Sequence, residues 1–267
     1  MYYPHRNCGH FHVPLLKIGS FKAIPLLILL FLSPHICTAQ VEKDVSSHYN
    51  WFDSLIGIEN LEMHYGAVYV EKHRSKSKKS KFFPSPYFSP GHVVIDNLPY
   101  YSLNLKYNIY EDELLMQAAN EFGGKVLKLY KDKINNFTIA DHTFIRIDGS
   151  EINNDAVDSG FYEVVLEKPP FTLLKRYRRL LKEQLGANLI FYEFEVLDPE
   201  FVVHYNTVYH RLKKIGDIKA LFPQNTVQLN DFIKNQPSGL SFENQLKSAF
   251  LFIDSLWNKE KDKATDE

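Results

Sequence analysis

Alternating apolar and polar residues across Tyr100–Tyr110 are the strongest structural signal in the chain. Odd positions hold the apolar set Tyr101, Leu103, Leu105, Tyr107 and Ile109. The even positions hold the set expected on a wetter face, which includes Tyr100, Asn104, Lys106 and Tyr110. A period of two is typical of a strand that buries one face and solvates the other. We therefore predict that this strand is central to the fold, with Leu105 in the core.

Shorter apolar segments continue on both sides, separated by turn dipeptides such as Asp96-Asn97, Glu111-Asp112, Gly123-Gly124 and Asp148-Gly149. The expected strands are Glu62–Val70, Gly91–Ile95, Glu113–Gln117, Val126–Tyr130, His142–Ile147, Phe161–Leu166, Phe171–Arg178, Leu189–Val196 and Phe201–Tyr209. The three prolines of Phe82–Pro90 argue against a central strand there. About ten strands at this spacing predict a mainly β, α+β fold, in which an antiparallel meander forms a curved sheet, a sandwich or an open barrel.

The last quarter of the chain changes from a period of two to a helical period. Two short helices are predicted at Ile218–Phe222 and Val227–Asn235, which Pro223 and Pro237 end. Ser241 is a suitable N-cap for a third helix. Its apolar positions recur at three- and four-residue steps: Phe242, Leu246, Ala249, Phe250, Ile253 and Leu256. One face of this helix must therefore pack on the sheet.

The first 39 residues have the layout of a signal peptide. Arg6, Lys17 and Lys22 precede the apolar run Ala23–Leu32, which as a helix would span roughly 15 Å, about half of a bilayer core. Cys37-Thr38-Ala39 then places small residues where cleavage after Ala39 requires them. An uncleaved anchor and lipid attachment at Cys37 are the weaker alternatives. We expect export to the periplasm, the outer-membrane periphery or the extracellular space, and no integral membrane protein after cleavage.

Removal of this leader changes the composition of the chain. The sequence has two cysteines, Cys8 and Cys37, and both leave with it. The full chain has 31 Lys and Arg against 32 Asp and Glu, so loss of the basic leader makes the remainder slightly acidic. This balance disfavours nucleic acid as a partner. We expect a single β-rich domain over 40–258, with helices in 217–258, followed by a charged tail, 259–267.

Several segments resemble one protein family. The segments are Leu55–Asn60, Tyr65-Gly66, Tyr69–Arg74, Lys81–Phe83, the strand that begins at Gly91, Leu105–Leu115, Gly160–Val164, Leu221–Pro223 and Phe232-Ile233. They are similar to the uncharacterised, exported, β-rich proteins common in Bacteroidota, and the likeness covers most of the chain after the leader. The resemblance implies a Gram-negative envelope setting and transfers no catalytic residue. The Lys-Ser alternation at Lys76–Lys81 is richer in charge than the usual form.

Familiar catalytic motifs are missing from the sequence: it has no G-x-S-x-G, H-E-x-x-H, G-x-G-x-x-G or Walker loop, and no cysteine cluster. His204 and His210 lie on one predicted strand, about 20 Å apart and too far to share a metal ion. Glu193 and Glu195 share a strand face at roughly 7 Å, which suits inverting glycosidases, although any solvated face produces such pairs. We assign no catalytic residue, metal or cofactor.

A basic run is the most distinctive local feature. Its basic residues are Lys72, Arg74, Lys76, Lys78, Lys79 and Lys81. Together with the neighbouring aromatics Phe82, Phe83, Tyr87 and Phe88, they form a candidate surface for anionic lipid or acidic polysaccharide. The alternative is a solvated loop whose charges protect a strand edge from aggregation. A second cluster, Lys175–Arg179, has the pattern of a strand end.

These observations predict an exported cell-envelope protein that acts as a non-catalytic binding or accessory protein. Its partner could be another envelope protein, an anionic lipid or a polysaccharide. The alternative is a hydrolase of envelope polysaccharide or peptide whose site is not visible as a motif. A compact pocket lined by Glu193, Glu195 or a histidine in a perturbed environment would favour the enzyme.

Overall fold

The computed structural model describes residues 47, 66–73, 75, 79–117, 125–151, 157–186 and 189–265. The predicted leader with its cleavage site after Ala39, and the turn at Gly123-Gly124, lie outside the described residues. The segments below belong to one compact unit, Asp44–Glu267.

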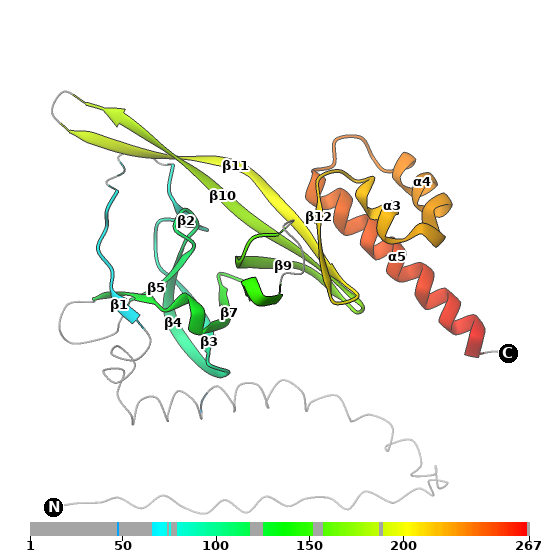
Figure 1. Cartoon of the computed structure of the whole chain (residues 1–267), viewed down its shortest axis with the longest axis horizontal. Helices are drawn as coiled ribbons and strands as arrows, with labels where there is room; N and C mark the ends of the chain where they lie inside the picture. Colours follow the sequence, from blue (N-terminus) through cyan, green and yellow to red (C-terminus); the bar gives the residue numbers. More distant parts are fainter. Residues whose placement is uncertain are drawn as a thin grey trace, which may run out of the picture. The chain divides into compact units, whose positions relative to one another are not determined.

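One antiparallel sheet of twelve strands dominates the described residues (Figure 1). The strand order is β1-β6-β5-β4-β3-β7-β8-β9-β10-β11-β12, and β2 pairs with β4. The strands are β1 Gly66–Val68, β2 Phe82–Phe83, β3 Ser89–Ile95, β4 Leu98–Asn108, β5 Glu113–Gln117, β6 Val126–Leu129, β7 Ile134–Ile139, β8 His142–Ile147, β9 Gly160–Lys168, β10 Phe171–Leu185, β11 Ile190–Tyr205 and β12 Val208–Leu212. The sheet does not close on itself, and the predicted mainly β, antiparallel fold is confirmed.

The predicted meander around Tyr100–Tyr110 is present as β3-β4-β5-β6. The turn at Asp96-Asn97 has positive φ at both residues, which suits a two-residue hairpin. β7 was not predicted, because Asn135-Asn136 interrupts its alternation. A register irregularity between Val94 and Ile95 lets Ile134 and Phe137 both point into the core. β7 pairs with the open edge of β3. Strands are therefore added to the meander on both sides: β7 beside β3 and β1 beside β6.

A bulge in β4 changes which tyrosine is buried. Ser102 has a φ of 57°, and the register with β3 shifts between Gly91 and Val93. The shift moves Tyr100 into the core, at 8% exposure, whereas Leu105 and Tyr107 are buried as predicted. The prediction that Tyr100 belongs to the exposed face is therefore wrong. A bulge inserts one extra residue into the alternation, so every position before it changes face.

Two prolines lie within strands of the sheet. Pro90 lies within β3, a central strand, although the prolines had argued against one. Pairing of β3 with β7 begins only at Gly91, so the missing N–H of Pro90 removes no bond on that side. Pro199 lies within β11, in an irregularity opposite Arg176 and Arg178. The two strands predicted at Leu189–Val196 and Phe201–Tyr209 are consequently one long strand, followed by a turn at Asn206-Thr207 and by β12.

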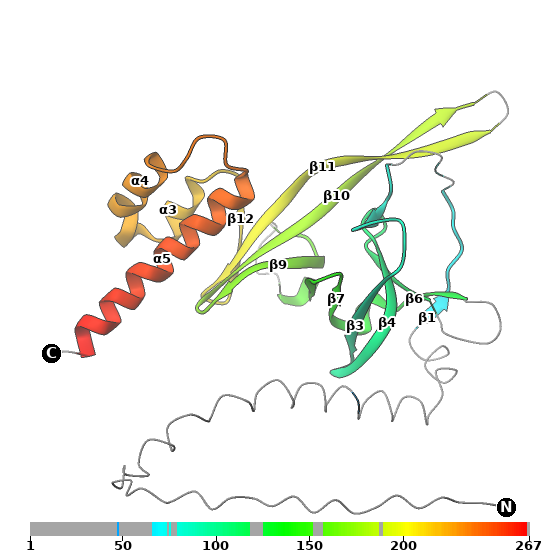
Figure 2. The same ribbon diagram turned by 180° about the vertical axis from the view of Figure 1, so that it is seen from behind.

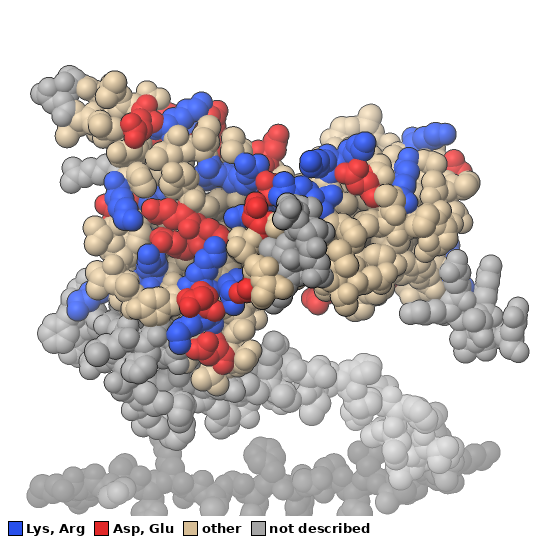
Figure 3. All heavy atoms as spheres, in the orientation of Figure 1, with Lys and Arg blue, Asp and Glu red and all other residues tan. Residues whose placement is uncertain are grey.

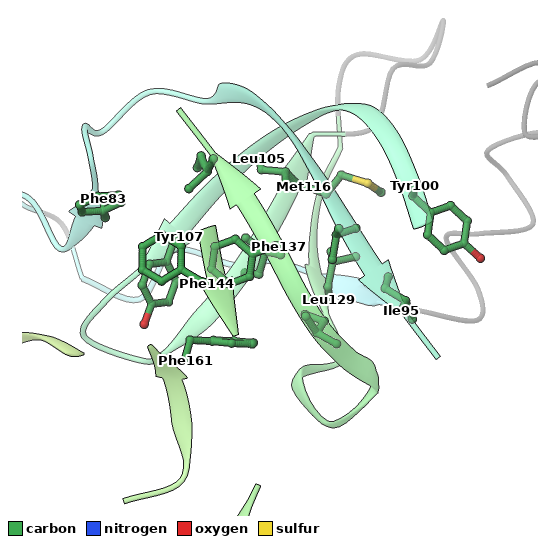
Figure 4. Packing of buried hydrophobic residues seen from close by; sticks show 14 of the residues in the cluster. Phe83, Ile95, Tyr100, Leu105, Tyr107, Met116, Leu129, Phe137, Phe144 and Phe161 are labelled. Atoms are coloured by element: carbon green, nitrogen blue, oxygen red, sulfur yellow. The ribbon is translucent and has the colours of Figure 1, made fainter. Parts of the chain in front are cut away.

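The first core lies inside the curved sheet from β2 to β9 (Figure 4). Its centre is aromatic: Phe137 and Phe144 stack with ring centroids 4.8 Å apart, and Tyr107 packs edge-on against Phe137 and at a tilt against Phe144. Figure 4 shows these side chains converging from different strands on a shared interior. Leu105, the centre of the predicted strand, is fully buried there.

The second core forms between the helices and strands β9 to β12 (Figure 2). The helices are α3 Asp217–Leu221, α4 Thr226–Lys234 and α5 Phe242–Thr265. Ser241 caps α5 as predicted, because its Oγ accepts a hydrogen bond from the Asn244 N–H. Leu246, Phe250 and Ile253 are fully buried, as their helical spacing requires. α5 continues beyond the predicted end at residue 258 to Thr265.

A buried carboxylate connects the two halves of the sheet. Asp112, in the turn between β4 and β5, accepts a 2.6 Å hydrogen bond from the Tyr107 hydroxyl and pairs with Lys131. The backbone N–H of Phe161 on β9 lies 3.4 Å from the same carboxylate, and Arg176 of β10 lies 4.0 Å away. Burial and the adjacent negative charge of Asp112 raise the pKa of Tyr107 well above its usual value. Tyr107 therefore stays a neutral donor.

Replacing Asp112 by Ala should destabilise the protein by about 3 kcal/mol. The buried Tyr107 hydroxyl would lose its hydrogen-bond acceptor, and Lys131 and Arg176 would lose a nearby negative charge. Urea unfolding followed by circular dichroism measures the change. Lys182→Gln is the matched control, since it breaks an ion pair whose two side chains are half exposed. Equal stability of Asp112→Ala and the wild type would show that the cluster does not hold the sheet together.

Candidate functional site: the arm of β10 and β11

The distal halves of β10 and β11 form a two-stranded ribbon. β9 pairs with Phe171–Lys175 of β10, and β12 pairs with Phe201–Tyr205 of β11. Beyond those positions, within the described residues, the two strands pair only with each other, from Arg178↔Leu197 to Leu185↔Ile190. We call Arg178–Leu185 together with Ile190–Leu197 the arm. Figures 1 and 2 show it extending past the neighbouring strands.

The inner face of the arm packs on the segment that follows β1. The ring of His73 lies edge-on to Tyr192, at 5.0 Å between centroids, and to Phe194, at 6.0 Å. Tyr110 packs against both His73 and Phe194. Phe194 is buried as a result. This aromatic cluster fixes the arm relative to the first core.

A buried lysine reinforces this contact. Lys81 is 2% exposed, and its Nζ donates to Glu71 at 2.8 Å and to Glu111 at 3.3 Å. Burial alone would lower the pKa of Lys81, but its hydrogen bonds to Glu71 and Tyr69 raise it overall. Burial raises the pKa of Tyr69 to about 12. The Nζ atom also lies 5.8 Å from the ring centroid of Phe194, so Lys81 links the arm to the segment beside it.

Lys79 and Lys81 of the predicted anionic-surface patch lie next to the arm. Of its six residues, Lys72, Lys79 and Lys81 are described, whereas Arg74, Lys76 and Lys78 lie outside the described residues. Lys79 pairs with Glu193 at 3.6 Å and is 60% exposed. The backbone carbonyl of Ser80 accepts a hydrogen bond from Arg179 Nε at 3.3 Å. Because Lys81 is buried and paired, we leave it out of the patch.

Glu193 and Glu195 lie on the arm and share a face, as their spacing predicted. By register they oppose Lys182 and Leu180 on β10. Glu195 pairs with Lys182 at 2.5 Å, and that hydrogen bond lowers the pKa of its carboxyl group. A lowered pKa is the opposite of what a general acid needs. The pair lines neither of the two cavities described next.

A cavity of about 660 Å³ lies where β12 ends beside the N-terminus of α5. Its lining includes Arg178, Glu200, Arg211, Ser241 and Glu243. Glu200 is paired with Arg178 at 3.0 Å and with Arg211 at 3.5 Å, and Glu243 with Lys175 at 2.7 Å. Its charged groups thus largely neutralise one another.

A second cavity, of about 460 Å³, lies where β8 and β9 separate beyond Phe144. Its lining includes Asp141, His142, Glu163, Thr172 and His204. His142 Nδ1 lies 2.5 Å from Glu163 Oε1, and the Tyr177 hydroxyl donates to Glu163 Oε2 at 2.8 Å. Because an ionised carboxylate only accepts, His142 donates from Nδ1. In the neutral ring, Nε2 is then the acceptor nitrogen.

The two histidines expected on a single strand are on neighbouring strands instead. The turn at Asn206-Thr207 pairs His204 with Tyr209 and His210 with Val203. Adjacent positions point to opposite faces, so the two side chains diverge. The expected separation along one strand was therefore wrong. Within the described residues, no group of three or more His, Cys, Asp or Glu is placed to hold a metal ion.

Comparison with known proteins identifies no relative: no family, curated protein or solved structure matches the chain. The resemblance to exported Bacteroidota proteins therefore stays a prediction. In the part of the chain that the structure describes, no helix is both long enough and apolar enough to cross a membrane.

Sequence reasoning missed the arm as a unit. Strands were expected at Phe171–Arg178 and Leu189–Val196, so Arg179–Leu185 was left unassigned. In this stretch adjacent Leu180 and Leu181 break the alternation, and three charged or amide residues follow them. The available signal was symmetry: the apolar residues Leu185, Leu189 and Ile190 lie around Gly186, as at the turn of a hairpin.

Replacing Lys81 by Met should destabilise the protein by about 2 kcal/mol near pH 7, because Glu71 and Glu111 lose their buried partner. Since the pKa of Lys81 is raised in the folded state, its contribution is present below the unfolded value of about 10.4 and is lost as pH rises through the folded value. Urea unfolding of both proteins at increasing pH should show their difference shrinking in alkali. A difference that stays constant would contradict this assignment.

Proposed function

We propose that the protein is an exported, non-catalytic binding protein of the cell envelope, and that it attaches to an anionic surface through the arm and the basic segment beside it. The observation that carries the proposal is the anchoring of this segment. His73 packs on Tyr192, and Lys79 contacts Glu193, so both described ends of the 73–79 stretch are held against the arm. Lys79, the described basic residue of that stretch, is therefore held at the arm.

Charge density supports the same conclusion. The segment contributes Lys72, Arg74, Lys76, Lys78 and Lys79 within eight residues, whereas the whole chain has a formal net charge of −1. Elsewhere the visible surface mixes both signs: in Figure 3, basic and acidic side chains intermingle over the sheet. Attraction to an anionic surface is worth about 1 kcal/mol per basic residue near it and weakens with salt. A local basic cluster can therefore bind an anionic surface even though the net charge of the whole chain is slightly negative.

The test compares two variants with the same net charge. The patch variant replaces Lys72, Arg74, Lys76, Lys78 and Lys79 by Gln. The control variant replaces five exposed lysines elsewhere, Lys125, Lys168, Lys213, Lys214 and Lys234, by Gln. The ligands are immobilised dextran sulfate and vesicles of equal parts phosphatidylglycerol and phosphatidylcholine, with pure phosphatidylcholine as the neutral reference.

Wild type and control variant should bind both anionic ligands, more weakly at higher salt, whereas the patch variant should lose about tenfold or more in affinity. Surface plasmon resonance gives the first affinity, and vesicle sedimentation gives the second. Equal binding by the patch variant and the control would reject the proposal.

A hydrolase is the second candidate function, and the His142–Glu163 pair in the 460 Å³ cavity favours it. A carboxylate that holds Nδ1–H orients the imidazole so that Nε2 can take a proton from an attacking water. Threonine hydroxyls and the phenol of Tyr209 also line the cavity, as a hydroxyl-rich substrate would require.

If the cavity is catalytic, His142→Ala should lower kcat by about 100-fold or more on any chromogenic glycoside or peptide substrate that the wild type cleaves. His92→Ala is the control, since His92 lies on β3 against Tyr101 and does not line the cavity. Activity that survives His142→Ala would remove this candidate, as would the lack of wild-type turnover on the whole substrate panel.

A further inference from the structure

We infer that the anionic surface is a lipid bilayer and that the tip of the arm inserts its aliphatic side chains among the lipids. This inference rests on the proposed function and adds the identity of the partner. The tip consists of Leu185, Gly186, Leu189 and Ile190 among the described residues, and it closes through a 2.9 Å hydrogen bond from the Gly186 N–H to the Leu189 carbonyl.

Aliphatic exposure is concentrated at this tip. Leu185 is 88% exposed, Leu189 61% and Ile190 48%. Leu185 and Ile190 oppose each other in the ladder, so their side chains share one face. Val196, at 66%, and Leu180, at 45%, are exposed farther from the tip on the same arm, and others, such as Val227 on α4, lie on different elements. A cluster of exposed aliphatics at the end of a ribbon is costly in water unless another apolar phase receives it.

The described residues at the tip approach one another closely. A Cβ at Gly186 would lie 2.8 Å from the Phe191 ring and 3.0 Å from the Leu189 carbonyl oxygen. The close approach holds the two strands together up to the turn, and the ladder continues to Leu185↔Ile190. The aliphatic side chains are therefore presented by paired backbone. Among the described residues, the outer edges of the two-stranded ribbon carry unpaired N–H and C=O groups, which restricts the tip to a shallow position in a membrane.

The spacing between apolar and charged groups matches a bilayer surface. Lys182, the first basic residue behind the tip, is three positions before Leu185, which is about 10 Å along a strand. Lys79 lies at the same level, because its partner Glu193 opposes Lys182. Apolar faces of interfacial segments penetrate about 5–10 Å. Insertion of the tip would thus bring Lys79 and Lys182 to the headgroups.

Acidic residues limit the depth of insertion. Glu183 is exposed and only two residues from Leu185, and Glu193 is three residues from Ile190. Desolvating these carboxylates would be unfavourable, so the arm should stop once the tip is submerged. A shallow apolar tip with a basic segment behind it provides the two weak signals that stable, reversible membrane attachment requires.

The first experiment separates insertion from charge attraction. The tip variant replaces Leu185, Leu189 and Ile190 by Ser in the full chain. The control variant replaces three exposed aliphatics outside the arm, Val70, Val227 and Leu251, by Ser. The tip variant should lose about tenfold or more in affinity for the anionic vesicles and keep its salt-sensitive affinity for dextran sulfate, whereas the control should keep both.

The second experiment reports where the tip goes. Cys8 and Cys37 are replaced by Ser, and a single cysteine is introduced by Leu189→Cys, or by Val227→Cys as a control, for labelling with an environment-sensitive fluorophore. Addition of anionic vesicles should shift the emission of the label at Leu189→Cys to the blue. Vesicles that carry shallow lipid-borne quenchers should quench this emission. The label at Val227→Cys should show neither change.

Different results overturn different claims. Unaltered vesicle affinity of the tip variant, or no emission shift despite vesicle binding, overturns insertion and leaves the proposed electrostatic function standing. Failure of the wild type to bind either anionic ligand rejects the proposed function itself. A tip label that shifts with an envelope protein fraction but not with protein-free vesicles assigns the tip to a protein partner, and this also overturns the inference.

Discussion

The arrangement of the sheet depends on the contacts of one buried carboxylate, that of Asp112. It lies in one turn of the meander, yet it holds Tyr107 of β4, Lys131 after β6 and the start of β9. Gly160 must approach closely for this, since a Cβ there would lie 2.5 Å from Asp112 Oδ2 and its φ is 153°. A buried charge is tolerated only when it is paired and hydrogen-bonded. Asp112 meets that condition with groups from both halves of the sheet.

The position of the arm follows from this constraint. Asp112 holds β9 at the backbone N–H of Phe161, and β9 in turn pairs with β10 over Phe171–Lys175. Farther along, Lys81 and His73 hold the inner face of the arm near Phe194. Buried contacts thus fix the position of the base of the arm, whereas Leu185, Leu189 and Ile190 at its tip are exposed. Substitutions at Leu185 or Leu189 should therefore change binding with little effect on the free energy of unfolding.

The sequence predicted the elements well and their register poorly. Alternation identified β3, β4 and β5, and the helical period with Ser241 identified α5, because these signals are local. Tyr100 was assigned to the wrong face because the bulge at Ser102 depends on pairing with β3. Pro90 argued against a central strand, because the neighbours of a proline in the ladder cannot be known from the chain alone. Of the candidate surface, the basic segment was visible as composition, but the arm beside it was not.

Burial also explains why one member of a uniform-looking basic run differs from the others. In the sequence Lys81 is simply the last lysine of the series, next to Phe82. In the structure it pairs with Glu71 and Glu111 under Phe194, whereas Lys79, two residues earlier, is 60% exposed. The difference in exposure separates the two roles: Lys81 stabilises the root of the arm, and Lys79 lies at its surface. The same short segment can therefore hold the arm in place and supply charge behind its apolar tip.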